Sequence, residues 1–296
     1  MFKILDKNEL VKDLFTLKIV APRASKSIKP GQFVMIRIDE KGERIPLSVC
    51  DFNKEEETIT VVFNNEGSSL EHLSSLNVGD EILDFVGPLG EPSILLNMDI
   101  DELKEKRIIF VSEDSGSARI YPEVAWLYSN NVLSSALLGF KNSDELVYKK
   151  EIEGVRKEVF VSTLDGSIGN EGYVCETLKD VINKYKVDIV VAMGSTEMMS
   201  DVSNITKAKG IKTIVSLTTL MLDGTGMCGA CRLTIGGEVK FACQEGPEFD
   251  GHLVDYDEVI RRQKLYSNYE TKKKFRDKYG VEHKANEEAA VGKEEL

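Results

Sequence analysis

The chain has 296 residues, of which 42% are hydrophobic and 30% are charged, and this length favours two domains with sizeable cores. Fifty acidic residues against 38 basic ones leave a formal net charge of −12, which argues against nucleic-acid binding because phosphates must be neutralised by basic residues. No apolar run approaches the ~20 residues of a membrane span, and segment 1–15 carries charges where a secretory signal would be apolar. The five cysteines, an odd number, do not indicate a disulfide framework. We therefore predict a cytoplasmic protein with no nucleic-acid partner and no membrane span.

Residues 1–98 are predicted to form an antiparallel β-barrel. Five short segments are rich in β-branched and aromatic residues and are separated by turns that contain glycine. These segments are 14–22, 32–38, 46–52, 58–64 and 81–87. Regular spacing of this kind is typical of a barrel or a sandwich.

Residues 99–220 are predicted to form an α/β domain with a doubly wound parallel sheet. Buried-strand patterns alternate with helical patterns along this part of the chain. The strand patterns cover 107–112, 132–140, 159–163, 187–194 and 213–217, and the helical patterns cover 118–130, 173–185 and 196–210. Ligands of such domains bind at the carboxyl ends of the strands.

Three of the five cysteines gather in a glycine-rich segment, residues 221–255. Cys228, Cys231 and Cys243 follow the pattern C-x2-C-x11-C, and the last lies beyond a Gly-Gly pair that predicts a hairpin turn. The C-x2-C pair can direct two thiolates at one metal centre, and the glycines let backbone N–H groups approach cluster sulfides. Three interpretations are open at this point: a packed hairpin, a structural zinc site completed by His252, and a [2Fe–2S] cluster with its fourth ligand upstream.

The residues around the cysteines favour the iron–sulfur interpretation. Residues 223–252 resemble the cluster domain of the electron-transfer subunits of type-B dihydroorotate dehydrogenases, and still more the small subunit of NADH-dependent ferredoxin–NADP oxidoreductases. Five positions before Cys228, the first family has a cysteine, whereas this chain has Asp223. The second family has an iron-ligating aspartate there. The resemblance therefore implies a [2Fe–2S] cluster with the ligands Asp223, Cys228, Cys231 and Cys243.

Motifs in the barrel segment resemble those of the ferredoxin–NADP reductase superfamily. Residues 44–48 (RIPLS) match its R-x-P-[LIF]-[ST] signature and follow a PGQF element at 30–33. An arginine can hold flavin phosphates bidentately, and a small hydroxyl residue leaves room for the flavin ring. Ser68 and Glu71 have the capping-box form at the start of a short helix, whose N-terminus suits a phosphate. The resemblance implies FAD bound by Arg44, Pro46, Leu47, Ser48, Gly67, Ser68 and Ser69.

The α/β segment departs from that superfamily at the turn that normally binds nicotinamide dinucleotides. In place of G-G-G-x-G-x-A-P, residues 112–119 read SEDSGSAR, which keeps one glycine and adds the carboxylates of Glu113 and Asp114. Each negative charge beside a pyrophosphate would cost about 1–4 kcal/mol in a partly desolvated cleft, and Arg119 would offset one of them. Two interpretations stay open: NAD(H) or NADP(H) binds with altered affinity, or the site is degenerate and the subunit only relays electrons.

The predicted fold is multidomain: an FAD-binding β-barrel at 1–98, a nucleotide-binding-like α/β domain at 99–220, a small [2Fe–2S] hairpin domain at 221–255 and a charged helical tail at 256–296. The predicted function is that of an oxidoreductase subunit that passes electrons between a nicotinamide nucleotide, or a partner subunit, and a partner oxidoreductase. The resemblance implies a larger partner subunit that holds another flavin and [4Fe–4S] clusters, and ferredoxin as a further partner.

Other identities accompany this prediction. One is the electron-transfer subunit of a type-B dihydroorotate dehydrogenase, against which Asp223 counts. Another is a zinc-stabilised assembly subunit that kept the architecture and lost the redox role. The basic run 261–278 is interpreted as a helical arm that docks on an acidic partner, or as a solvated tail.

Overall fold

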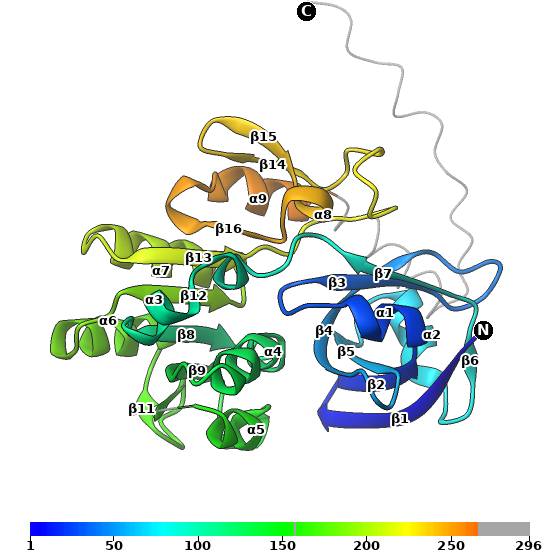
Figure 1. The fold of residues 1–296 in the computed structure, drawn as a ribbon, viewed down its shortest axis with the longest axis horizontal. Coiled ribbons are helices and arrows are strands. Elements are labelled where there is room, and N and C mark those ends of the chain that lie inside the picture. Colours follow the sequence, from blue (N-terminus) through cyan, green and yellow to red (C-terminus); the bar gives the residue numbers. More distant parts are fainter. Residues whose placement is uncertain (157, 266–296) are drawn as a thin grey trace, which may run out of the picture.

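The computed structural model describes residues 1–156 and 158–265, and its N-terminal part is a seven-stranded antiparallel sheet (Figure 1). The strands lie in the order β6-β1-β2-β5-β4-β3-β7. Their bounds are β1 Phe2–Val11, β2 Leu14–Val20, β3 Phe33–Arg37, β4 Ile45–Asn53, β5 Thr58–Asn64, β6 Glu81–Ile82 and β7 Asp84–Leu89. A single residue, Leu83, separates the two edge strands in the chain, so the sheet curls into a nearly closed barrel with little free edge. The predicted barrel is confirmed.

Alternating apolar side chains fill the barrel, because successive residues of a strand point to opposite faces. The buried set comes from neighbouring strands and includes Leu17, Ile19, Val34, Ile36, Leu47, Val49, Ile59 and Val61. Two short helices, α1 (Pro22–Ser27) and α2 (Ser68–Ser75), add Ala24 and Leu73 to this core. Helix α2 has Gly67 as its N-cap, with a φ of 86°, so Ser68 already lies inside the first turn. The predicted capping box at Ser68 is therefore wrong.

A second seven-stranded sheet has the order β11-β10-β9-β8-β12-β13-β16. Its strands are β8 Ile108–Glu113, β9 Ser134–Phe140, β10 Glu158–Thr163, β11 Asn170–Glu171, β12 Ile189–Met193, β13 Lys212–Ser216 and β16 Glu248–Asp250. Neighbouring strands are parallel except β13 and β16, which are antiparallel. Strand β8 lies near the middle, and later strands are added on both sides of it, so the predicted doubly wound sheet is confirmed.

Helices cover both faces of this sheet. Residues Ile108 and Phe110 of β8 pack with α4 (Gly116–Ser129) and α5 (Lys149–Gly154) on one face. Their neighbours Ile109 and Val111 pack with α6 (Val174–Lys184) and α7 (Thr196–Lys207) on the other. The short helices that connect these elements are η1 Ile94–Asn97, α3 Ile100–Lys104 and η2 Ser143–Glu145.

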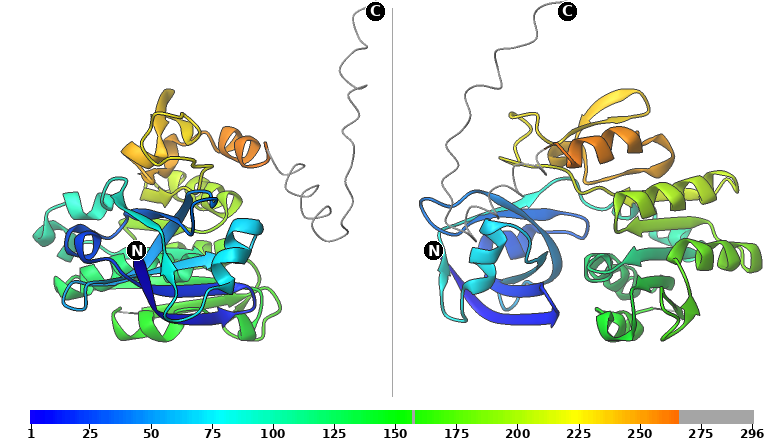
Figure 2. Two further views of the ribbon diagram at one scale, coloured as in Figure 1. Left: turned by 90° about the vertical axis from the view of Figure 1, so that its right-hand side faces the viewer. Right: turned by 180° about the vertical axis from the view of Figure 1, so that it is seen from behind.

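The cysteine-rich segment forms a small module on top of the α/β sheet (Figures 1 and 2). It consists of β14 Arg232–Ile235, β15 Glu238–Phe241, α8 Ala242–Glu245, η3 Gly251–Leu253 and α9 Tyr256–Gln263. Gly236 and Gly237, with φ of 59° and 85°, form the hairpin turn that the sequence predicted. Strand β16 leaves this module to pair with β13, so main-chain hydrogen bonds join the module to the α/β sheet. Of the predicted tail 256–296, residues 266–296 lie outside the described residues, as does most of the basic run 261–278.

Candidate functional site

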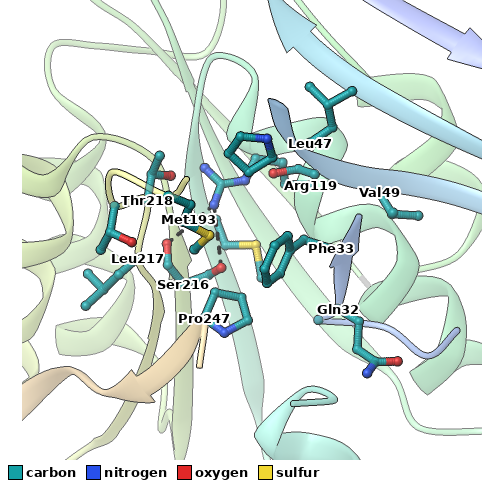
Figure 3. A pocket seen from close by; sticks show the side chains of 15 residues that line it. Gln32, Phe33, Leu47, Val49, Arg119, Met193, Ser216, Leu217, Thr218 and Pro247 are labelled. Atoms are coloured by element: carbon teal, nitrogen blue, oxygen red, sulfur yellow. Dashed lines mark hydrogen bonds between the residues drawn. The ribbon is translucent and has the colours of Figure 1, made fainter. Parts of the chain in front are cut away.

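A pocket opens between the barrel and the α/β domain (Figure 3). One wall comes from β3 and β4, and the other from the ends of β12 and β13 and from the loop that follows β13. Residues of these walls include Phe33, Pro46, Leu47, Ser48, Met193 and Thr218. The space between these walls, counted together with the solvent at its open mouth, measures about 600 Å³. The pocket lies at the carboxyl ends of the parallel strands, where doubly wound sheets bind their ligands.

The predicted flavin residues of β4 lie in this pocket. Pro46, Leu47 and Ser48 all line it, and Leu47 is buried while the other two are partly exposed. Apolar carbon atoms on this wall suit a planar aromatic ring. The Ser48 hydroxyl supplies a polar group at the same wall, so these three residues fit a flavin ring.

The other predicted flavin residues do not line the pocket. Arg44 is exposed just before β4, and Gly67, Ser68 and Ser69 form the start of α2. The Ser69 hydroxyl donates a hydrogen bond to Oε2 of Glu43 at 3.0 Å, which joins the start of α2 to the residue next to Arg44. A guanidinium and a helix N-terminus thus lie near one strand end, which suits the phosphates of a dinucleotide whose ring occupies the pocket.

Arg119 adds a cation to the pocket wall from the first turns of α4. Its Nη2 donates to the backbone oxygen of Ser216 at 3.4 Å and to the Ser216 hydroxyl at 3.5 Å (Figure 3). Burial lowers the pKa of Arg119, and the charge of Glu123 opposes that shift. The side chain is therefore directed to the pocket, and the expectation that it offsets Glu113 or Asp114 is not met.

The four predicted iron ligands form two pairs. The Sγ atoms of Cys231 and Cys243 are 3.2 Å apart, and both side chains are buried. The backbone N–H of Thr225 donates a hydrogen bond to Oδ1 of Asp223 at 2.9 Å, and Cys228 also hydrogen-bonds this carboxyl. These hydrogen bonds lower the pKa of Asp223. Two thiolates bound to one tetrahedral metal stand about 3.8 Å apart when each bond measures about 2.3 Å, so the buried pair is close to ligation geometry.

Two pairs of ligands suit a two-iron cluster, in which each iron takes two protein ligands. Within residues 1–156 and 158–265, no three His, Cys, Asp or Glu side chains gather closely enough to hold a single metal ion. His252, the candidate fourth ligand of a zinc site, is engaged elsewhere, since its Nε2 lies 3.0 Å from Oγ1 of Thr206 on α7. The donor set therefore fits a [2Fe–2S] cluster and does not fit the zinc hypothesis.

Glycines shape the loop that carries these ligands. Gly224, Gly226 and Gly229 have φ of 72°, 80° and 68°, a conformation that turns backbone N–H groups toward the concave side of a loop. Such groups are the hydrogen-bond donors that cluster sulfides require. Burial raises the pKa of Cys243 to about 11, so ligation by this thiol must release a proton.

The cysteine loop borders the pocket. Met221 lines the pocket, and Asp223 follows it by two residues. A Cβ added to Gly224 would lie 2.6 Å from Sδ of Met35 on β3 and 3.0 Å from Leu89 on β7, so the loop is seated directly on the barrel. The candidate ring site and the candidate cluster site therefore share a wall.

The turn that replaces the nucleotide-binding signature joins β8 to α4. Gly116 is its retained glycine, and a Cβ there would lie 2.1 Å from the carbonyl oxygen of Met193, so α4 packs directly on the end of β12. Oε2 of Glu113 accepts a hydrogen bond at 2.9 Å from the hydroxyl of Ser195, the N-cap of α7. Burial raises the pKa of both Glu113 and Asp114. An acidic side chain thus contacts the N-cap of α7, beside the turn that begins α4.

Comparison with known proteins supplies the family. Residues 218–255 match the family described as the iron–sulfur cluster binding domain of dihydroorotate dehydrogenase B. A dihydroorotate dehydrogenase B (NAD(+)) electron transfer subunit homolog from Thermotoga maritima is 39% identical over 268 residues, which are 90% of this chain and 92% of that protein. The chain belongs to the family of dihydroorotate dehydrogenase B electron transfer subunits and their homologues.

Two further relatives cover almost the whole chain. An uncharacterised protein in the adh 3′ region of Clostridium beijerinckii is 46% identical over 285 residues, 96% of each chain. The structure of an NADH-dependent reduced ferredoxin–NADP oxidoreductase superimposes with a TM-score of 0.86 at 37% identity and covers 94% of this chain and 98% of that one. The relatives thus share all three modules of the fold.

None of the helices in the described residues is long and apolar enough to cross a membrane.

Proposed function

We propose that this chain is an electron-transfer subunit that binds FAD in the pocket and a [2Fe–2S] cluster on the loop beside it. The observation that carries the proposal is the shared wall, since Met221 lines the pocket and Asp223 follows two residues later. A bound flavin accepts or gives electron pairs, and an iron–sulfur cluster passes electrons singly. With the two sites side by side, the chain could accept electrons in pairs at the flavin and pass them on one at a time through the cluster.

The chain's own residues would bind and orient both groups. Pro46 would exclude water from the ring, and the Ser48 hydroxyl would hydrogen-bond at its polar edge. Leu47 would hold this wall in place through the barrel core. Arg44 and the residues that begin α2, Gly67, Ser68 and Ser69, would hold the phosphates by charge and by N–H groups.

For the cluster, Asp223 and Cys228 would bind one iron, and Cys231 and Cys243 would bind the other. Asp223 is a harder ligand than a thiolate, so we expect the cluster potential to differ from that of a four-thiolate site. These assignments agree with the predicted division of the chain into a barrel at 1–98, an α/β domain at 99–220 and a cluster domain at 221–255.

We also propose a partner for the cluster side. Met227, which is 90% exposed, and the exposed Cys228 lie where single electrons would leave the chain. The relatives named electron transfer subunits support assembly with a partner oxidoreductase subunit. We propose that this partner is the larger subunit with flavin and [4Fe–4S] clusters that the sequence resemblance implies. Ferredoxin is the proposed further partner, and the cytoplasm is the proposed location.

A second candidate function concerns the nicotinamide nucleotide. The contact between Glu113 and Ser195 favours a relay subunit that takes electrons from its partner and does not bind NAD(H) or NADP(H) itself. Anaerobic titration with NADH separates the two functions, because direct binding predicts bleaching of the flavin. Failure to bleach at millimolar NADH, with reduction by the partner intact, would establish the relay.

The main proposal is tested by anaerobic purification of the full-length chain. We expect bound FAD together with iron and acid-labile sulfide, in a ratio of about two irons per chain. Material with neither iron nor labile sulfide would overturn the proposal, and stoichiometric zinc in their place would support the assembly subunit. Identifying the chain that co-purifies separates a dihydroorotate dehydrogenase from a larger [4Fe–4S] partner.

A further inference from the structure

Helix α9 lies against the loop that carries the proposed iron ligands. The basic run 261–278 begins on this helix, and its first two residues, Arg261 and Arg262, belong to the last turn. The Nη2 atom of Arg262 donates a hydrogen bond at 2.9 Å to the carbonyl oxygen of Ala230. Ala230 immediately precedes Cys231 and lies between the two cysteines of the C-x2-C pair. The helix therefore places a cation directly on the backbone of the ligand loop.

Contacts on more than one side hold α9 in this position. The buried Val259 packs in the core that the cysteine module shares with α6 and α7. The hydroxyl of Tyr256 lies 2.7 Å from that of Ser203 on α7. Near the other end of the helix, Nε2 of Gln263 donates to the backbone oxygen of Thr218 at 2.7 Å. The helix that carries the guanidinium is thus fixed both to α7 and to the loop that follows β13.

The charge of Arg262 is not neutralised by a carboxylate in the described part of the chain. None of the ion pairs within residues 1–156 and 158–265 includes this side chain. Glu258 lies four residues earlier and shares the same face of the helix, yet the two form no ion pair there. Arg262 is partly buried, whereas its neighbour Arg261 is exposed. Its positive charge is therefore directed to the neutral carbonyl oxygen in the ligand loop.

A hydrogen bond to the Ala230 carbonyl acts on the ligand residue that follows it. The carbonyl oxygen of Ala230 and the N–H of Cys231 belong to one peptide group. A cation at the oxygen withdraws electron density from the N–H, which makes that N–H a stronger hydrogen-bond donor. Donors of this kind stabilise the negative charge of cluster sulfides and thiolates. The contact of Arg262 therefore reaches the first coordination residues of the loop through a single peptide bond.

The proposed ligand set determines how a nearby cation affects the cluster. Three thiolates and one carboxylate each carry a negative charge, so the cluster that they would bind is an anion, and its reduction by one electron adds a further negative charge. A cation close to the ligand loop stabilises the more negative, reduced form more than the oxidised form. The expected result is a higher reduction potential of the cluster.

We propose that Arg262 is a positioning residue of the electron-transfer site, which holds the ligand loop at Ala230 and favours the reduced cluster by its charge. This inference deepens the proposed function and rests on it, since it requires the cluster on the ligand loop. It also divides the start of the basic run between two roles. Arg262 acts on the chain's own redox centre, whereas the exposed Arg261 does not.

The test compares variants in the last turn of α9. The full-length chain is purified anaerobically, and the potential of the iron–sulfur cluster is measured by redox titration followed by electron paramagnetic resonance. Arg262→Gln should lower the equilibrium constant for reduction about tenfold, which is a shift of about 59 mV for a one-electron couple. Arg262→Lys keeps the charge and should restore most of this loss. Arg261→Gln removes the same charge one residue away and should change the constant less than about twofold, because water screens an exposed charge.

The outcomes separate this inference from the proposed function. An intact cluster with an unchanged potential in Arg262→Gln, or equal shifts in Arg262→Gln and Arg261→Gln, would overturn the role of Arg262 alone. A wild-type chain without iron would overturn the proposed function together with this inference. A purely structural contact predicts that Lys shifts the potential as far as Gln does, and that result also contradicts the role of the charge. If Arg262→Gln binds no cluster, Arg262→Lys decides: a potential near that of the wild type supports the role, and loss of the cluster or a tenfold lower constant overturns it.

Discussion

The barrel wall of the pocket and the turn after β8 each contain part of a sequence signature, but the residues retained in the two regions have different roles. On the barrel side, Pro46 and Ser48 line the pocket on either side of Leu47, whose side chain belongs to the barrel core, so two residues of that signature face the ligand space. In the turn, Gly116 has no room for a side chain because of the Met193 carbonyl, while Glu113 fills space beside Ser195. The barrel thus keeps residues that face a ligand, and the turn keeps the glycine that packing requires. A partial motif can therefore preserve the fold after its ligand-facing positions have changed.

The largest expected effect lies on the ligand-facing side, at the cluster. Asp223→Ala should lose the [2Fe–2S] cluster because one iron would keep a single protein ligand, while FAD stays bound. Asp223→Cys should retain iron because it supplies a thiolate at the same position. Iron, labile sulfide and flavin are measured on anaerobically purified protein. Unchanged iron in Asp223→Ala would remove Asp223 from the ligand set.

Gly116 tests the packing side of the comparison. A methyl group at this position would lie 2.1 Å from the Met193 carbonyl oxygen, so Gly116→Ala should lower the free energy of unfolding by about 3 kcal/mol. The control is Gly154→Ala on α5, where a Cβ meets nothing within 4 Å; there the change should stay below about 1 kcal/mol. Urea unfolding of flavin-free protein measures both. Equal stability of the two variants would mean that Gly116 is not retained for packing.

Glu123, which is buried beside Ser93, adds a pH dependence that neither wall of the pocket would supply. The pKa of Glu123 in the folded state lies well above the ordinary value of 4.5, so above that pH the folded protein holds a proton that the unfolded chain releases. The wild type should therefore lose stability relative to Glu123→Gln as pH rises from about 4.5, by up to about 1.4 kcal/mol per pH unit until the folded pKa is reached. Urea unfolding from pH 4 to 8 checks this, and parallel curves would contradict it.

The smallest expected effect concerns the acidic residues of the turn. The double variant Glu113→Gln, Asp114→Asn removes two negative charges and should tighten NADH binding about tenfold, because screened repulsion of this kind amounts to about 1–2 kcal/mol. Glu81→Gln on the barrel strand β6 is the charge control and should leave NADH binding unchanged. Fluorescence titration measures both. No gain in the double variant would mean that the turn does not face a nucleotide and would strengthen the relay function.

The sequence predicted the elements whose signal is local. Strands β2 to β5 and helices α4, α6 and α7 follow from their hydrophobic period, and the Gly236–Gly237 hairpin follows from its turn residues. Strand β1 escaped prediction because Ile4 is its only fully buried residue. Strand β16 escaped it because three residues pair only when β13 is already in place.

The site residues were likewise predictable only where their sequence signal is local. The residues of β4 and the cysteine loop are each contiguous in sequence, and the structure brings each group together. The buried contacts of Ser93 with Glu123 and Glu248 carry no such signal, because Ser93 lies 30 residues from Glu123 and 155 from Glu248 in the sequence. The direction of Arg119 depends equally on where β13 places Ser216. Both the contacts of Ser93 and the direction of the Arg119 side chain depend on strands that come together only when the sheet is complete.

Strand β16 has a consequence for how electron flow is controlled. It fastens the cysteine module to the α/β sheet, while Gly224 seats the ligand loop against Met35 on the barrel. A hinge motion between the two large domains would have to break one of these attachments. If the proposed flavin and cluster are bound, we expect the distance between them to stay the same during function, so that domain opening and closing would not control electron transfer. We therefore expect electron flow to depend on whether a partner docks at the exposed Met227.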